Sequence, residues 1–179
     1  AITVLTVAAM LTAIGFINAR RVARVVRIDI PLAGLPAPLV GFTIVQISDI
    51  HVGPTIKGNY VGAIVDRVNS LGADLIAITG DVVDGSVREL SSHTAPLAKL
   101  VARHGSYIVT GNHEYYSGAQ AWMSEFQRLG LRGLMNEHVV IEHDGAILVV
   151  AGVTDYSTHA FDLAQRSDPH VALAGCPER

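Results

Sequence analysis

Three short polar clusters hold the residues of this sequence whose types and spacing could bind a metal ion. The first is Asp49-Ile50-His51, the second runs over residues 80–84, and the third runs over residues 111–114. Carboxylates, imidazoles and amide oxygens are ligands that divalent metal ions take in proteins. A single Asp-x-His occurs often by chance, but three such clusters in succession favour one shared metal site.

Each polar cluster directly follows an apolar run that is typical of a buried β-strand. The three runs are residues 44–47, 75–78 and 107–109. Apolar residues at helical spacing predict helices over residues 60–68, 87–103 and 122–129. Strands that alternate with helices indicate a mostly parallel α/β sheet, in which ligands gather at the carboxyl ends of the strands. We therefore expect the three clusters to meet at one edge of the sheet.

The local backbone decides which way these polar side chains point. Side chains alternate along a strand, so Asp49 and His51 point to the same side if the extended geometry continues through them. Gly80 and Gly111 allow the backbone to turn sharply just before a polar side chain that must face a ligand. Both features favour a site built on the ends of strands.

The C-terminal part of the sequence has a different pattern. Two apolar runs, residues 139–141 and 147–150, flank His143-Asp144-Gly145, which predicts a β-hairpin with Asp-Gly at its turn. Four histidines come after the third cluster, namely His138, His143, His159 and His170. None of them follows a buried run, so we expect exposed polar positions and not metal ligands.

Composition limits the class of protein. The chain has 179 residues, which is enough for one domain with a real core. A net charge of -3 with 16% charged residues gives no basic footprint for nucleic acid. The one cysteine, Cys176, excludes an internal disulfide framework.

The N-terminal segment carries most of the excess hydrophobicity. Residues 1–18 lack charge and predict a transmembrane anchor at the short end of what spans a bilayer. Residues 19–40 then form a basic juxtamembrane segment and a Pro/Gly-rich linker, and residues 41–179 form the main domain. The basic residues are Arg20, Arg21, Arg24 and Arg27, which place that domain on the cytoplasmic side by the positive-inside rule. A cleaved signal peptide and a buried core helix are the alternatives.

Taken together, the three clusters resemble the calcineurin-like metallophosphoesterases. That family has Asp-x-His, then Gly-Asp-x-x-Asp, then Gly-Asn-His-Asp/Glu, and the match covers about residues 42–155. The run Ser48–Gly53 behind an apolar N-terminal segment looks most like the bacterial membrane-associated phosphodiesterase branch. The resemblance implies an α/β fold, namely the N-terminal part of a layered β-sandwich flanked by helices, preceded here by a transmembrane helix.

The resemblance also implies a role for each residue of the clusters. The implied metal ligands are Asp49, His51, Asp81 and Asn112, with Asp81 bridging two ions. The ions could be manganese, iron, zinc or magnesium, and would activate a hydroxide that attacks the phosphorus. His113 would act on the leaving-group oxygen as general acid or charge stabiliser, oriented by Asp84. Glu114 is expected to be a supporting or surface group.

The expected function is a hydrolase, a binuclear phosphoesterase whose substrate is a phosphodiester, phosphomonoester or pyrophosphate. The membrane anchor favours a lipid-linked substrate. Family members complete the site with later histidines, one of them in Gly-His-x-His, and this chain has no such motif. We therefore expect a domain that is incomplete at its C-terminus and inactive alone. The alternatives are a non-catalytic membrane-tethered scaffold and a nucleotide-binding module, for which no glycine-rich phosphate loop is present.

Overall fold

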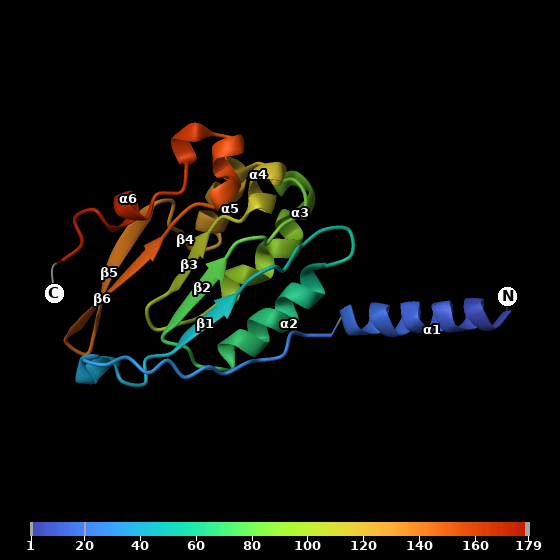
Figure 1. Ribbon diagram of the computed structural model, residues 1–179, viewed down its shortest axis with the longest axis horizontal. Helices are drawn as coiled ribbons and strands as arrows, with labels where there is room; N and C mark the ends of the chain where they lie inside the picture. Colours follow the sequence, from blue (N-terminus) through green and yellow to red (C-terminus); the bar gives the residue numbers. More distant parts are fainter. Residues whose placement is uncertain (1, 20, 178–179) are drawn as a thin grey trace.

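Two β-sheets form the centre of the computed structural model, which describes residues 2–19 and 21–177 (Figure 1). The larger sheet is parallel, with the order β1 (Ile44–Ile47), β2 (Leu75–Thr79), β3 (Ser106–Val109) and β4 (Arg132–Gly133). The smaller sheet is the antiparallel pair β5 (Glu137–His143) and β6 (Ala146–Gly152). The α-helices are α1 (Ile2–Ala19), α2 (Gly58–Asn69), α3 (Val87–Thr94), α4 (Asn112–Ser117), α5 (Ala119–Arg128) and α6 (Pro169–Leu173). Four 3-10 helices are η1 (Ala37–Leu39), η2 (Ala95–Lys99), η3 (Tyr156–Ala160) and η4 (Leu163–Gln165).

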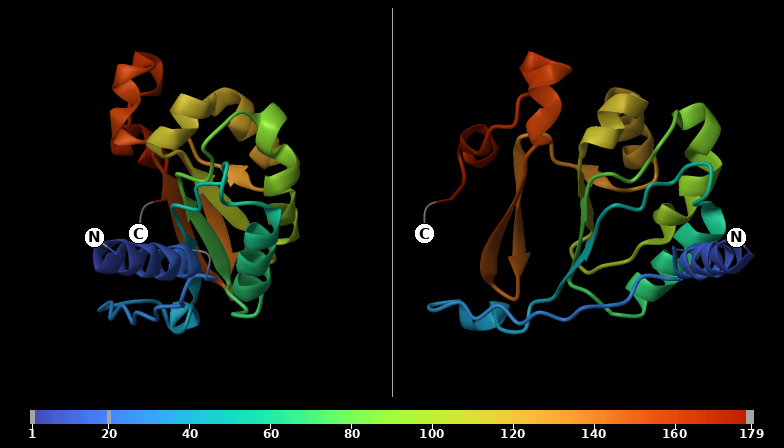
Figure 2. Two further views of the ribbon diagram at one scale, coloured as in Figure 1. Left: turned by 90° about the vertical axis from the view of Figure 1, so that its right-hand side faces the viewer. Right: turned by 45° about the vertical axis from the view of Figure 1, so that its right-hand side comes forward.

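The parallel sheet is covered on both faces. Successive side chains of a strand point to opposite faces, so one strand contributes to two hydrophobic cores. On one face, Ile76 and Ile78 of β2 join a core formed with α2, α3 and α5. On the other face, Leu75 of the same strand packs with Val139 and Ile141 of β5. The result is three layers, with helices, the parallel sheet and the hairpin in that order (Figure 2).

The predicted strands and the hairpin are confirmed. Strands β1, β2 and β3 pair in parallel, and their carboxyl ends lie at one edge of the sheet. The hairpin turns at Asp144 and Gly145, which have φ values of 50° and 87°. Positive φ at both central residues is what a two-residue turn of the favoured hand requires.

The helix predicted over residues 87–103 is wrong in its length. Helix α3 ends at Thr94, and a 3-10 turn occupies residues 95–99. Pro96 has no N–H to donate and disfavours helical geometry in the residue before it. Strand β4 and helix α4 were not predicted, since two and six residues are too short to show a period.

The N-terminal prediction is not matched by the structure. Helix α1 does cover the apolar segment and extends away from the domain (Figures 1 and 2). Within residues 2–19 and 21–177, however, no helix combines the length and the apolar character needed to cross a membrane. The transmembrane helix predicted over residues 1–18 is therefore not found there. Ala1 of that predicted helix and Arg20 of the predicted juxtamembrane segment lie outside the described residues.

Candidate metal centre

The loops after β1 and β2 bring the first two polar clusters together. Strand β1 ends at Ile47, and the backbone of Asp49 and His51 then turns into the left-handed region, with φ values of 55° and 51°. Asp81 does the same after β2, with φ of 52°. The two loops stay paired, because the N–H of His51 donates to the carbonyl of Asp81 at 3.0 Å.

This backbone geometry has a physical cost and corrects part of the prediction. A left-handed residue other than glycine costs about 1–2 kcal/mol, and such strain concentrates at functional sites. Asp49 and His51 do lie on the same side, with Oδ1 and Nε2 3.8 Å apart. They reach that position through turns. The prediction from strand alternation required the strand to continue through both residues, and it does not.

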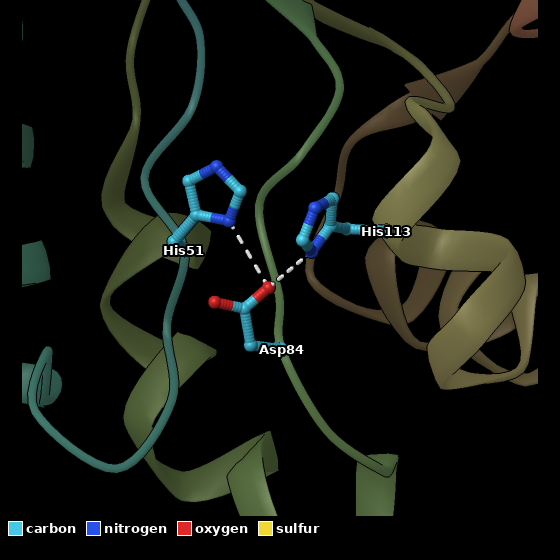
Figure 3. Close-up of side chains that lie close together, drawn as sticks. All are labelled: His51, Asp84 and His113. Carbon is cyan, nitrogen blue, oxygen red and sulfur yellow. Dashed lines mark hydrogen bonds and ion pairs between the residues drawn. The ribbon is translucent and has the colours of Figure 1, made fainter.

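Asp84 joins the first and third clusters through a single oxygen (Figure 3). Its Oδ1 lies 3.0 Å from Nδ1 of His51 and 2.6 Å from Nδ1 of His113. An ionised carboxylate only accepts hydrogen bonds, so both Nδ1 atoms donate to it. The Nε2 atom of each ring is then left for a metal ion or for a transferred proton.

Five of the six predicted site residues form two overlapping groups. Asp49, His51 and Asp81 make one group, and His51, Asp84 and His113 make the other. In each group the possible ligand atoms lie within 4.8 Å of one another. Asn112, the sixth residue, is half-buried and begins α4 directly before His113.

The protonation states of Asp84 and His51 follow from these contacts. The hydrogen bond to Asp84 raises the pKa of His51, and burial only partly opposes it. Burial works to raise the pKa of Asp84, but the bonds from both imidazoles outweigh it and the net shift is downward. Asp84 is thus held as a carboxylate that accepts the Nδ1–H of His51.

Glu114 supports the site from behind and is completely buried. Its Oε1 accepts the N–H groups of Val82 and Val83, and its Oε2 accepts those of Asp81 and Gly111, at 2.7–3.3 Å. Burial raises the pKa of Glu114, while the N–H groups of Gly111, Val82 and Asp81 favour its charged form. The sequence indicates a supporting or a surface group at this position, and the structure shows the supporting one.

Gly80 and Gly111 let the second and third loops touch backbone to backbone. Gly80 has φ of 85°, and a Cβ there would lie 2.2 Å from the nitrogen of Gly111. A Cβ on Gly111 would lie 2.2 Å from Oδ1 of Asp81. Real atoms do not approach so closely, so both positions accept only glycine without movement of the loops.

The later histidines lie apart from these groups. Among the residues that the structure describes, neither group includes His138, His143, His159 or His170. The expectation of exposure is wrong for His143, which is 6% exposed and whose Nδ1 lies 2.8 Å from Nε2 of His104. It is also wrong for His138, which is half-buried and whose Nδ1 lies 2.8 Å from the carbonyl oxygen of Ala172. His159 and His170 are exposed, as expected.

Comparison with known proteins identifies the family. The model of the calcineurin-like phosphoesterases matches residues 42–174, which is most of the chain. The chain belongs to the calcineurin-like phosphoesterase family. This is a hydrolase family that acts on phosphate esters, typically with two metal ions, and the Asp/His groups described above are candidate ligands.

Relatives of the chain come from animals and bacteria. It is 34% identical over 96% of its length to the zebrafish (Danio rerio) "Transmembrane protein with metallophosphoesterase domain". Identity to the cattle (Bos taurus) protein of the same name is 35% over 95% of the chain. A Helicobacter pylori metallophosphoesterase is 40% identical over 63% of the chain and 30% of its own length. The chain spans 40% of the length of each animal relative.

Proposed function

We propose that the protein containing this chain hydrolyses a phosphate ester with two divalent metal ions at the edge of the parallel sheet. The observation that carries the proposal is the convergence of three strand ends on two overlapping groups of carboxylates and imidazoles. A phosphodiester, a phosphomonoester and a pyrophosphate all fit such a site.

The donor set fits divalent ions of intermediate character, such as manganese, iron, zinc or magnesium, because it mixes carboxylate oxygen with imidazole nitrogen. Asp49 and His51 would hold one ion, Asp81 would be shared by both, and Asn112 would hold the other through its amide oxygen. When bound, the ions supply the positive charge that activates a water and neutralises the phosphoryl oxygens. Glu114 keeps the Asp81 loop in place for this role.

His113 is proposed to act at the leaving group. Its Nδ1 donates to Asp84, which fixes the orientation of the ring. As the P–O bond breaks, the leaving oxygen would take the proton from Nε2 of His113. Asp84 is therefore a positioning residue for His113 as well as for His51.

The test is hydrolysis of bis(4-nitrophenyl) phosphate by the native protein, first chelated and then supplied with Mn²⁺. We expect Asp81→Asn to lower the rate by about 100-fold or more, because it removes charge from the bridging position. Asp66→Asn, at an exposed carboxylate of α2, is the matched control and should retain the rate. Full activity in Asp81→Asn would refute the proposal. Weak Mn²⁺ binding in calorimetry together with no hydrolysis of any ester would favour the scaffold function instead, since a scaffold needs no tight metal site.

The same proposal includes membership of the bacterial membrane-associated branch of the family and association of the protein with a membrane. Its support is the exposed apolar surface of α1, the exposed residues Arg21, Arg24 and Arg27, and the word "transmembrane" in the names of two relatives. The same proposal places the catalytic domain on the cytoplasmic side and gives it a lipid-linked substrate. The division of the chain near residue 40 stays a prediction.

Co-sedimentation with vesicles of anionic lipid tests the membrane association. Equal sedimentation of a variant without residues 2–19 would contradict a role of α1 in this association.

A further inference from the structure

Three aromatic rings form a continuous wall beside His113. We call Tyr115, Tyr116 and Phe161 the aromatic wall. The ring of Tyr116 meets His113 edge to face at 5.6 Å and Phe161 at 5.2 Å, and Phe161 stacks on Tyr115 at 5.6 Å. The wall therefore starts at a side chain of the candidate site and extends away from it onto the segment that follows β6.

Two of the three rings are open to solvent although they are large and mostly apolar. Tyr116 is 65% exposed and Phe161 is 45% exposed. Neither belongs to the two hydrophobic cores of the domain. Exposed aromatic groups that gather next to a polar site are typical of a ligand-binding surface.

The wall is held in place by hydrogen bonds and not only by ring contacts. The hydroxyl of Tyr115 donates to Oε1 of Gln165 at 3.1 Å and accepts from Thr110 at 3.3 Å. Thr154 donates to the carbonyl of Gln165 at 2.7 Å, and Asp155 donates its N–H to Thr110 at 3.4 Å. The segment that carries Phe161 is thus docked on the loop that leads into the third cluster.

The helix geometry of α4 places the wall on the leaving-group side of the site. His113 and Tyr116 are three residues apart and so share one face of the helix. In the proposed function, Nε2 of His113 acts on the leaving oxygen. The rest of the leaving group then lies nearest to Tyr116 and Phe161.

The charges around the aromatic wall limit the charge that the leaving group can carry. Two carboxylates belong to the segment beside the wall, since Asp162 directly follows Phe161 and the N–H of Asp155 donates to Thr110, which contacts the Tyr115 hydroxyl. These carboxylates would repel a second anionic group, such as the outer phosphate of a pyrophosphate. An uncharged group is favoured on this side.

We propose that the aromatic wall is the leaving-group subsite and that it selects phosphate esters of an uncharged, planar aromatic alcohol. The inference rests on the proposed function, since it takes the position of the leaving oxygen from the role of His113. Planarity is favoured because Tyr116 and Phe161 present aromatic surface on which a ring can stack.

The test compares three substrates in the native protein with Mn²⁺, namely the phenyl, 2-naphthyl and 4-butylphenyl esters of methyl phosphate. The ratio of kcat/KM for naphthyl over phenyl is measured in the wild type, in Tyr116→Ala and in Phe161→Ala. Comparing ratios between variants cancels the different reactivities of the esters. We expect each variant to lower the naphthyl preference by about threefold to tenfold, the range for one aromatic contact. Tyr156→Ala is the matched control, because its exposed ring contacts His159 instead of the wall.

Two results would overturn the inference while leaving the proposed function intact. One is an unchanged naphthyl preference in both wall variants, with Asp81→Asn still inactive. The other is a larger effect on the butyl ester than on the naphthyl ester, which would assign the wall to an acyl chain. Activity that survives Asp81→Asn would refute the proposed function itself. Saturation-transfer NMR of methyl (2-naphthylmethyl)phosphonate, in which a CH₂ group replaces the leaving oxygen, reports contact with the wall without turnover. Measured on the wild type and on each variant, loss of the naphthyl signal is expected only in the wall variants.

Discussion

Replacing the buried carboxylate of Glu114 by an amide should destabilise the domain and weaken metal binding together. In Glu114→Gln, one of the two oxygens that each accept two backbone N–H groups becomes an NH₂ group. Whichever way the amide turns, two N–H groups face a donor. A buried donor without an acceptor costs about 1–3 kcal/mol, so the loss is about 2–6 kcal/mol. Removing a buried charge offsets part of it, and we expect about 3 kcal/mol.

The effect on the metal site arises because Glu114 accepts the backbone N–H of Asp81. Glu114 holds the backbone of Asp81, whose left-handed geometry is strained. Freeing that loop should lower the affinity for Mn²⁺ by about 10- to 100-fold, the usual effect of removing a group that supports a ligand.

Urea unfolding of the chelated protein measures the first effect, and calorimetric titration with Mn²⁺ measures the second. Chelation matters because a bound ion would itself stabilise the fold. Glu142→Gln, at an exposed position of β5, is the matched control and should change both quantities little. A loss of less than about 0.5 kcal/mol in Glu114→Gln, within the range of ordinary surface substitutions, would refute the reasoning.

Two further predictions concern a loop contact and the pH dependence of stability. Gly111→Ala should abolish hydrolysis and cost about 3 kcal/mol, because its Cβ would meet Asp81 at 2.2 Å, whereas Gly62→Ala, with open space in α2, should be neutral or stabilising. Burial works to raise the pKa of Asp74, but the N–H and hydroxyl of Thr43 outweigh it and the net shift is downward. Its contribution is therefore present above the unfolded pKa of about 3.9 and is lost as pH falls through the lower folded value. Urea unfolding should show Asp74→Ala about 1 kcal/mol less stable at pH 7, and a difference that does not shrink below about pH 4 would contradict this assignment.

The sequence predicted those parts of the fold in which a local pattern agrees with the tertiary packing. Apolar runs predicted β1, β2 and β3, and Asp-Gly predicted the hairpin turn. Helix α3 was predicted too long because the apolar period runs past Pro96, which the backbone cannot follow. The burial of His143 could have been predicted, since it lies two residues after Ile141 on the inner face of β5.

The candidate site was predictable in its residues but not in its geometry. The spacing of three clusters selected the five residues that the structure brings together, while the role of Asn112 stays a prediction. Positive φ values at Asp49, His51 and Asp81 could not be assigned from the residue types, because Asp and His are enriched in that region but adopt it in only a minority of cases. The aromatic wall was also missed, since Phe161 reaches Tyr116 only through the folded segment after β6.

The order of strands in the parallel sheet has a consequence for how the protein is made. The strands lie side by side in the order in which the chain runs, β1-β2-β3-β4, so each one pairs with a neighbour already synthesised. All six candidate site residues lie between Asp49 and His113. The site residues can therefore come together as the chain emerges from the ribosome, before β5 and β6 have left the exit tunnel. Pausing translation at a point where α5 has left the exit tunnel but β5 has not should then leave a nascent chain in which β1, β2 and β3 are already paired.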